Sequence, residues 1–177
     1  MLRMAILLER KNNMAHSRDF DDPDLSLPAE AVADDPRRAA RILAMQFLHQ
    51  LTVQNGASLE LLDAFLDQYS DHPETRRLAR GWIRGAWQQR AVIDEMIRSV
   101  SDNWDLTRIS RVDRSNLELA VYQLMFCPDI PPKAAINEAV ELAKMFSTAQ
   151  APAYINGVAD AIWKKLQNKP NLADPSV

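Results

Sequence analysis

The chain has little cysteine, histidine or glycine, with one, three and four of these residues among its 177. A single cysteine, Cys127, excludes an intramolecular disulfide and a cysteine-based zinc cluster, so a reducing, cytoplasmic setting is expected. His16, His49 and His72 have no cysteine partners and lack metalloprotease spacing, so we expect neither a metal site nor a cofactor. The apolar stretch at residues 4–8 is too short for a signal sequence or a membrane span.

The usual signatures of catalysis are also missing from the sequence. It has no glycine-rich phosphate-binding loop, and no serine stands in the setting of a nucleophile elbow. Cys127 follows a predicted helix and has no basic neighbour in the sequence that would activate it, which favours a structural thiol. We therefore expect no enzymatic activity.

The net charge of −3 is unevenly distributed along the chain. Residues 1–36 carry four basic and eight acidic side chains, whereas the remainder carries seventeen and sixteen. A nearly neutral body excludes a general polyanion-binding surface, so nucleic-acid binding would require a local basic patch. Residues 1–35 lack periodicity and are predicted to form a disordered acidic arm, followed by a domain at 36–170 and a flexible tail at 171–177.

From Asp35 onward, apolar residues recur with the period of an α-helix. Asp35 and Pro36 provide an N-cap and a first-turn proline, and the first helix is predicted to end at Asn55-Gly56. Further helices are predicted at 58–69, as one long helix between Pro73 and Val100, and at 113–126, 133–146 and 152–167. Gly81 and Gly85 lie one turn apart in the long helix, where either close approach of a second helix or a bend is possible. The 113–126 helix is apolar nearly all round and is expected to be central. The sequence predicts an all-α fold, with a joint between two halves near residues 102–111.

The predicted first helix begins with three arginines that project within about 100° of arc, away from its apolar stripe. These are Arg37, Arg38 and Arg41. Guanidinium groups beside the free N–H groups of a helix N-terminus suit phosphate binding. Arginines on an exposed face can instead serve solubility alone, and charge by itself favours that simpler interpretation.

Four segments resemble the NusB family in order and spacing. Residues 36–48, PRRAARILAMQFL, resemble its first-helix signature, and the segment 104–114 resembles the lead-in to its central helix. The most specific match is IPPKAAINEAVELAK at 130–144, followed by YINGVAD at 154–160. The resemblance covers roughly residues 36–167.

The resemblance implies a compact, NusB-like bundle of about six to seven helices in two small subdomains. It implies a transcription antitermination factor that binds single-stranded boxA RNA of nascent ribosomal RNA transcripts together with the ribosomal protein NusE, in a complex with RNA polymerase. The positions that match RNA-contacting ones in the family are Arg37, Arg38, Arg41, Lys144, Phe146, Gln150 and Tyr154. The positions that match partner-facing ones are His49 and Asp113. Some relatives dimerise through the RNA-binding face, so a homodimer is an open alternative.

Alternatives remain for individual residues and for the function. Residues 147–153 lack the charged side chains that the family often has there, so backbone N–H groups are expected to contribute. Tyr154 can stack on a base or cover the core, and Phe146 is better explained as a core residue. Asn137, Glu138 and Asn156 are expected to form interhelical hydrogen bonds rather than RNA contacts. The alternative functions are a non-catalytic protein-interaction module, or a relative of the NusB-like RNA-binding domain of RNA cytosine methyltransferases.

Overall fold

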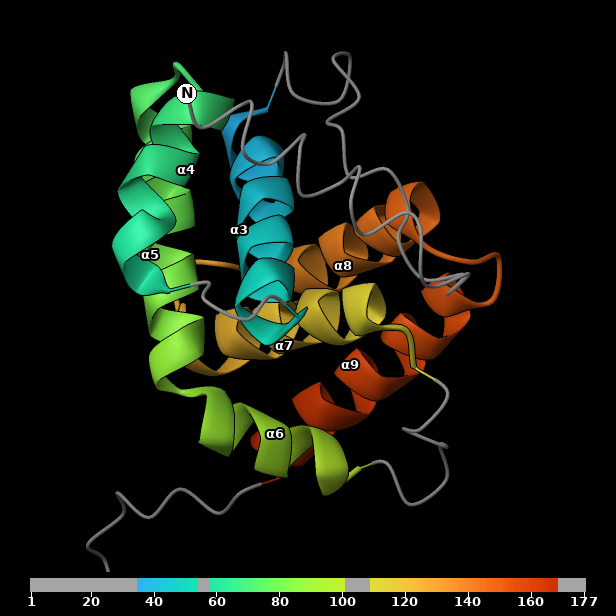
Figure 1. The fold of residues 1–177 in the computed structure, drawn as a ribbon. Coiled ribbons are helices and arrows are strands. Elements are labelled where there is room, and N and C mark those ends of the chain that lie inside the picture. The colour runs from blue at the N-terminus through green and yellow to red at the C-terminus, as the bar shows by residue number, and fades with distance from the viewer. Residues whose placement is uncertain (1–34, 54–57, 101–108, 169–177) are drawn as a thin grey trace, which may run out of the picture.

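The computed structural model describes residues 35–53, 58–100 and 109–168, which form seven α-helices and one short 3-10 helix, without a strand (Figure 1). The predicted all-α fold is confirmed. The acidic arm up to residue 34, most of the predicted joint (101–108) and the end of the chain from 169 lie outside the described residues. Among the helices described, none combines the length and the apolar character that a membrane span needs.

The first helix, α3 (Pro36–Val53), begins as its sequence predicts. The Asp35 carboxylate accepts a hydrogen bond from the backbone N–H of Arg37 at 2.8 Å. The Asp35 carbonyl accepts the first helical bond, from Ala39 at 3.0 Å. This side-chain cap satisfies an N–H group that the helix itself leaves without a partner. The cap places Arg37 and Arg38 in the first turn of the helix.

A short 3-10 turn, η1 (Leu59–Leu61), leads into α4 (Leu62–Tyr69), and α5 (Pro73–Gln88) runs back beside α3. The Ser58 side chain caps the turn by accepting from the backbone N–H of Glu60, and His72 caps α5 by accepting from that of Thr75. Figure 1 shows α3, α4 and α5 as an upright group on one side of the molecule.

The prediction of one long helix between Pro73 and Val100 is wrong. The chain ends α5 at Gln88 and begins α6 (Arg90–Arg98) after Gln89, whose ψ of 8° departs from helical geometry. The change of direction lets α6 pack on α7 and α9 while its apolar residues Ile93, Met96 and Ile97 become buried. Burial of this face explains why a break is stable where periodicity alone predicts a continuous helix.

The second half consists of α7 (Arg111–Phe126), α8 (Pro132–Phe146) and α9 (Ala151–Gln167). Helix α7 packs against α3, α5, α6, α8 and α9, which confirms its predicted central position. Helix α3 is equally enclosed, because every residue from 39 to 49 is buried. The exposed and half-buried side chains of α3 are therefore confined to its first turn and its C-terminal end.

Helices α7 and α8 are joined by a buried polar contact. The Asn116 side chain donates to the carbonyl of Ala139 at 2.8 Å. The predicted interhelical role of Asn137 and Asn156 is wrong, because both are exposed and neither side chain forms a hydrogen bond within the described residues. Asn116 forms an interhelical hydrogen bond because it lies on the buried side of α7.

Candidate nucleic-acid interface

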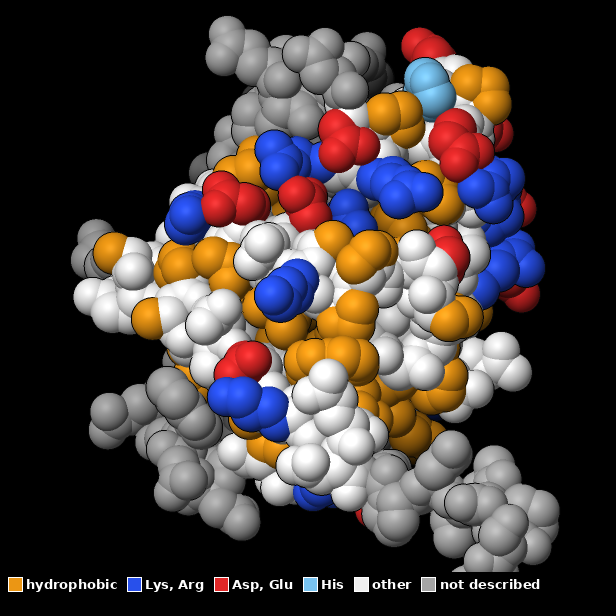
Figure 2. Space-filling view, turned by 180° about the vertical axis from the view of Figure 1, so that it is seen from behind, with side chains coloured by type: hydrophobic (Ala, Val, Ile, Leu, Met, Phe, Trp, Pro, Cys, Tyr) orange, Lys and Arg blue, Asp and Glu red, His pale blue; other side chains and the backbone are white. Residues whose placement is uncertain are grey.

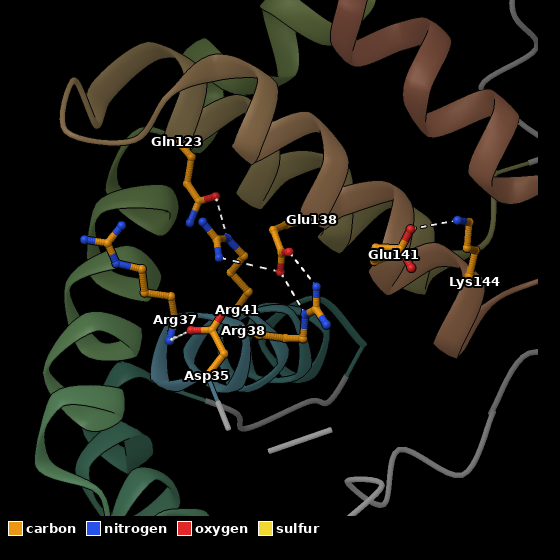
Figure 3. A network of polar contacts seen from close by, with 8 residues as sticks. All are labelled: Asp35, Arg37, Arg38, Arg41, Gln123, Glu138, Glu141 and Lys144. Atoms are coloured by element: carbon orange, nitrogen blue, oxygen red, sulfur yellow. Dashed lines mark hydrogen bonds and ion pairs between the residues drawn. The ribbon is translucent and has the colours of Figure 1, made fainter. Parts of the chain in front are cut away.

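The structure separates the three arginines of α3 by exposure. Arg37 is exposed, and its side chain extends away from Glu138 towards α5 (Figure 3). The Arg38 side chain is 38% exposed and the Arg41 side chain only 6%. Within the described part of the chain, the Arg37 guanidinium forms no ion pair. Arg37 is thus the arginine of this cluster whose guanidinium has no partner among the described residues.

Arg38 is held by a carboxylate from α8. Its Nε donates to Oε2 of Glu138 at 3.1 Å and its Nη2 donates to Oε1 at 2.7 Å (Figure 3). Two parallel bonds of this kind fix the plane of the guanidinium as well as its position. The hydrogen bonds from Arg38 to Glu138, followed by the Coulombic attraction, raise the pKa of Arg38 above its ordinary value. The expected interhelical hydrogen bond of Glu138 is confirmed.

Arg41 lies inside the protein, between three helices. Its Nε donates to Oε1 of Gln123 on α7 at 3.2 Å, and its guanidinium lies 5.3 Å from the ring centroid of Trp82 on α5. Its Nη1 is 3.7 Å from Oε2 of Glu138 on α8. Burial lowers the pKa of Arg41, while the negative charge of Glu138 opposes that shift. The expected exposed arc of three arginines is therefore wrong for Arg41, whose guanidinium is enclosed by α5, α7 and α8.

The remaining predicted RNA-contacting residues lie at the far end of α8 and the start of α9. Lys144 is exposed, and its Nζ is 2.7 Å from Oε1 of Glu141. In Figure 3, Lys144 lies beyond Arg38, on the opposite side from Arg37. Gln150 is exposed, Tyr154 is half-buried against the core, and Phe146 is buried in it. The structure thus supports the core interpretation of Phe146.

The two predicted partner-facing residues, His49 and Asp113, are buried rather than displayed on the surface. Asp113 accepts hydrogen bonds at 2.8 Å from the hydroxyls of Ser110 and Ser147, and its backbone N–H donates to Ser110. Asp113 thereby connects the start of α7 to the loop that follows α8. Burial raises the pKa of Tyr154 to about 12, and the negative charge of Asp113 contributes to the same shift.

Cys127 fits the structural role predicted for it. The thiol is half-buried at the end of α7. Burial, assisted by the nearby charge of Asp129, raises its pKa to about 11, so it stays protonated at neutral pH. Such a thiol is a poor nucleophile.

Charged side chains on the face opposite to the view of Figure 1 are mixed in sign. Figure 2 shows lysine and arginine side chains lying beside aspartate and glutamate across its upper part, with apolar side chains over its middle. Arg77 with Glu74 and Arg80 with Asp63 are such pairs on α4 and α5. A polyanion would therefore be bound at particular cationic groups rather than over a broad basic surface.

Three side chains of the candidate site were not predicted from the sequence. Trp82 and Gln123 contact Arg41, and Ser147 donates to Asp113. Gln123 carries a recognisable signal, because it is an amide within a helix that is otherwise apolar on most sides. Trp82 and Ser147 carry no comparable signal, since an aromatic core residue and a serine after a helix are both common.

The chain is similar to proteins of one family over most of its length. Residues 38–164 match the model of the NusB family. The transcription antitermination protein NusB of Syntrophus aciditrophicus (strain SB) is 38% identical over 133 residues, which cover 75% of this chain and 83% of the relative. The structure of T. maritima NusB is 34% identical, with a TM-score of 0.65, covering 74% of this chain and 92% of that one.

A further structural neighbour comes from a crystal structure of the antitermination factors NusB and NusE in complex with dsRNA. Its TM-score is 0.66 and its identity 24%, with 73% of this chain and 97% of that chain covered, so this likeness shows the fold. The family match and the identity to the curated relative show more than the fold. The chain belongs to the NusB family of transcription antitermination factors.

Proposed function

We propose that this chain binds the boxA RNA of nascent ribosomal RNA transcripts together with the ribosomal protein NusE, and so supports processive transcription by RNA polymerase in the cytoplasm. The observation that carries the proposal is the exposed Arg37 beside the oriented Arg38 in the first turn of α3. The structural neighbour described with NusE and dsRNA has the same fold, which supports the choice of partners.

The chemistry of this surface suits single-stranded RNA. Guanidinium groups pair with phosphate oxygens through two parallel hydrogen bonds, and Arg37 and Arg38 offer such donors. Lys144 adds a compact positive charge on the neighbouring helix. Unpaired bases stack on aromatic side chains, and the half-buried Tyr154 is the candidate for such stacking here. In this proposal Arg41 acts by supporting the fold beneath Arg38 rather than by touching RNA.

Arg37→Ala is expected to weaken binding of a boxA RNA and to reduce its salt dependence. For a single strand, each lost phosphate contact lowers the slope of log K against log salt by about 0.7. The free energy of unfolding should change by less than about 0.5 kcal/mol, because the side chain is exposed and forms no ion pair within the described residues. Fluorescence anisotropy with labelled RNA at several salt concentrations measures both affinity and slope.

Arg98→Ala is the matched control for Arg37→Ala. Arg98 is also exposed, but it lies at the end of α6, far from the start of α3 (Figure 1). The net charge changes equally in both variants, so a difference in slope between them reports a local contact rather than overall charge. Equal slopes for Arg37→Ala, Arg98→Ala and the unmodified chain would contradict the proposed site.

A further inference from the structure

Glu138 is an acidic residue at the centre of the proposed RNA-binding surface. A carboxylate in such a place would ordinarily repel RNA phosphates. Both of its oxygens are engaged, since Oε1 and Oε2 accept from Nη2 and Nε of Arg38, and Oε2 also lies 3.7 Å from Nη1 of Arg41. The Glu138 side chain is 18% exposed, so it lies deeper than that of Arg38. This position needs an explanation other than solubility.

The geometry of the pair leaves part of Arg38 available. A guanidinium presents two edges that can each donate two parallel hydrogen bonds. Glu138 occupies the edge formed by Nε and Nη2, and Nη1 of Arg38 has no partner among the described residues. Glu138 is the more deeply buried partner, and the edge of the Arg38 guanidinium that carries Nη1 points away from it (Figure 3).

Displacement of Glu138 by a phosphate is unfavourable. Glu138 is also the carboxylate beside Arg41, whose side chain is 6% exposed. If Glu138 moved away, the buried Arg41 charge would keep Gln123, the ring of Trp82 and the charge of Asp35 as the described neighbours that stabilise it. Loss of one partner from a buried charged pair is strongly destabilising. Glu138 therefore stays in place while the outward edge of Arg38 remains open to a ligand.

We propose that Glu138 is a positioning residue for RNA, which fixes the Arg38 guanidinium by one edge so that the other edge receives a phosphate. This inference rests on the proposed function. A guanidinium that is already ordered loses less conformational freedom when it binds, so its contact with phosphate is tighter than that of a mobile arginine. The benefit of orientation exceeds the repulsion between the RNA and a carboxylate that Arg38 and Arg41 already neutralise.

Glu138→Gln tests the proposal through the sign of its effect. The substitution removes one negative charge, which by electrostatics alone would tighten RNA binding. A glutamine side chain has only one oxygen that can accept from Arg38, and its NH₂ group would face the second guanidinium donor. Arg38 therefore loses its fixed orientation. We expect the affinity for RNA to fall by about three- to tenfold. Glu138→Asp keeps the charge but shortens the side chain, and the affinity should fall in this variant as well.

Glu141→Gln is the matched control. Glu141 lies on the same helix, is 46% exposed, and contacts Lys144 alone among the basic residues described. Its replacement removes the same charge and frees Lys144, so RNA binding should tighten. Opposite signs for Glu138→Gln and Glu141→Gln would support the proposal, whereas tighter binding in both would overturn it.

Glu138→Gln in an Arg38→Ala background separates positioning of Arg38 from a general effect on the fold. If Glu138 acts through Arg38, Glu138→Gln should cause no further loss of affinity once Arg38 is absent. An equal loss of affinity in both backgrounds would overturn the proposal. So would a fall in the thermal stability of Glu138→Gln that is large enough to account for its weaker binding. Failure of the unmodified chain to bind boxA RNA would instead refute the proposed function, and with it this inference.

Discussion

Arg41→Ala is expected to lower the free energy of unfolding by about 2–4 kcal/mol, combining a cavity with an unsatisfied polar group. The side chain is 6% exposed, so its removal leaves a space that α5, α7 and α8 enclose. Oε1 of Gln123 loses its donor, which lies at 3.2 Å, and the cation–π contact with Trp82 is lost as well. Urea denaturation followed by circular dichroism measures the difference.

Arg37→Ala on the same helix provides the comparison for Arg41→Ala. Both substitutions remove one arginine from the first two turns of α3, but only Arg41 is enclosed. We expect a large loss of stability with Arg41→Ala and a small change with Arg37→Ala, whereas the RNA salt slope should respond in the opposite order. Equal stability losses in the two variants would show that Arg41 is not the buried support that the structure describes.

Gly85→Ala should destabilise the protein, whereas Gly81→Ala, one turn earlier on α5, should stabilise it. A Cβ atom at Gly85 would overlap the hydroxyl and the ring of Tyr122 on α7, but a Cβ at Gly81 meets no atom within 4 Å. The Tyr122 ring stacks on Phe126 with centroids 5.6 Å apart, so a shift of the ring would disturb that contact. Overpacking of this kind costs about 1–3 kcal/mol.

The opposite sign at Gly81 follows from helix propensity. Alanine is favoured over glycine within a helix by about 1 kcal/mol, and the exposed Gly81 has room for the methyl group. Thermal unfolding of the two variants, measured side by side, should give midpoints that shift in opposite directions. Two upward shifts would contradict the overpacking predicted at Gly85, because they would mean that the Tyr122 ring moves aside at little cost.

Local signals in the sequence predict the helix starts well. Asp35 and Pro36 define the start of α3 because a cap and a fixed φ act within a few residues of each other. Pro132 and Pro152 likewise stand in the first turns of α8 and α9. Local signals do not predict the break after Gln88, because it depends on the surface that α7 and α9 offer to α6.

The different surroundings of the three arginines could not be predicted, because they depend on distant residues. Periodicity places Arg37, Arg38 and Arg41 on one side of α3, but the side chains that enclose Arg41 come from three other helices. No helical wheel shows that α5, α7 and α8 meet there. The hydrogen bonds between Ser110 and Asp113 are easier to predict from the sequence, because a serine three residues before an acidic residue at a helix start is a capping pattern.

The affinity of the full chain for a boxA RNA, compared with that for an RNA of the same composition in permuted order, tests the proposed function most directly. Both RNAs are measured at one salt concentration, with and without NusE. The proposed function predicts tighter binding of the boxA RNA, with a larger preference when NusE is present. Equal affinity for the two RNAs under both conditions would contradict it.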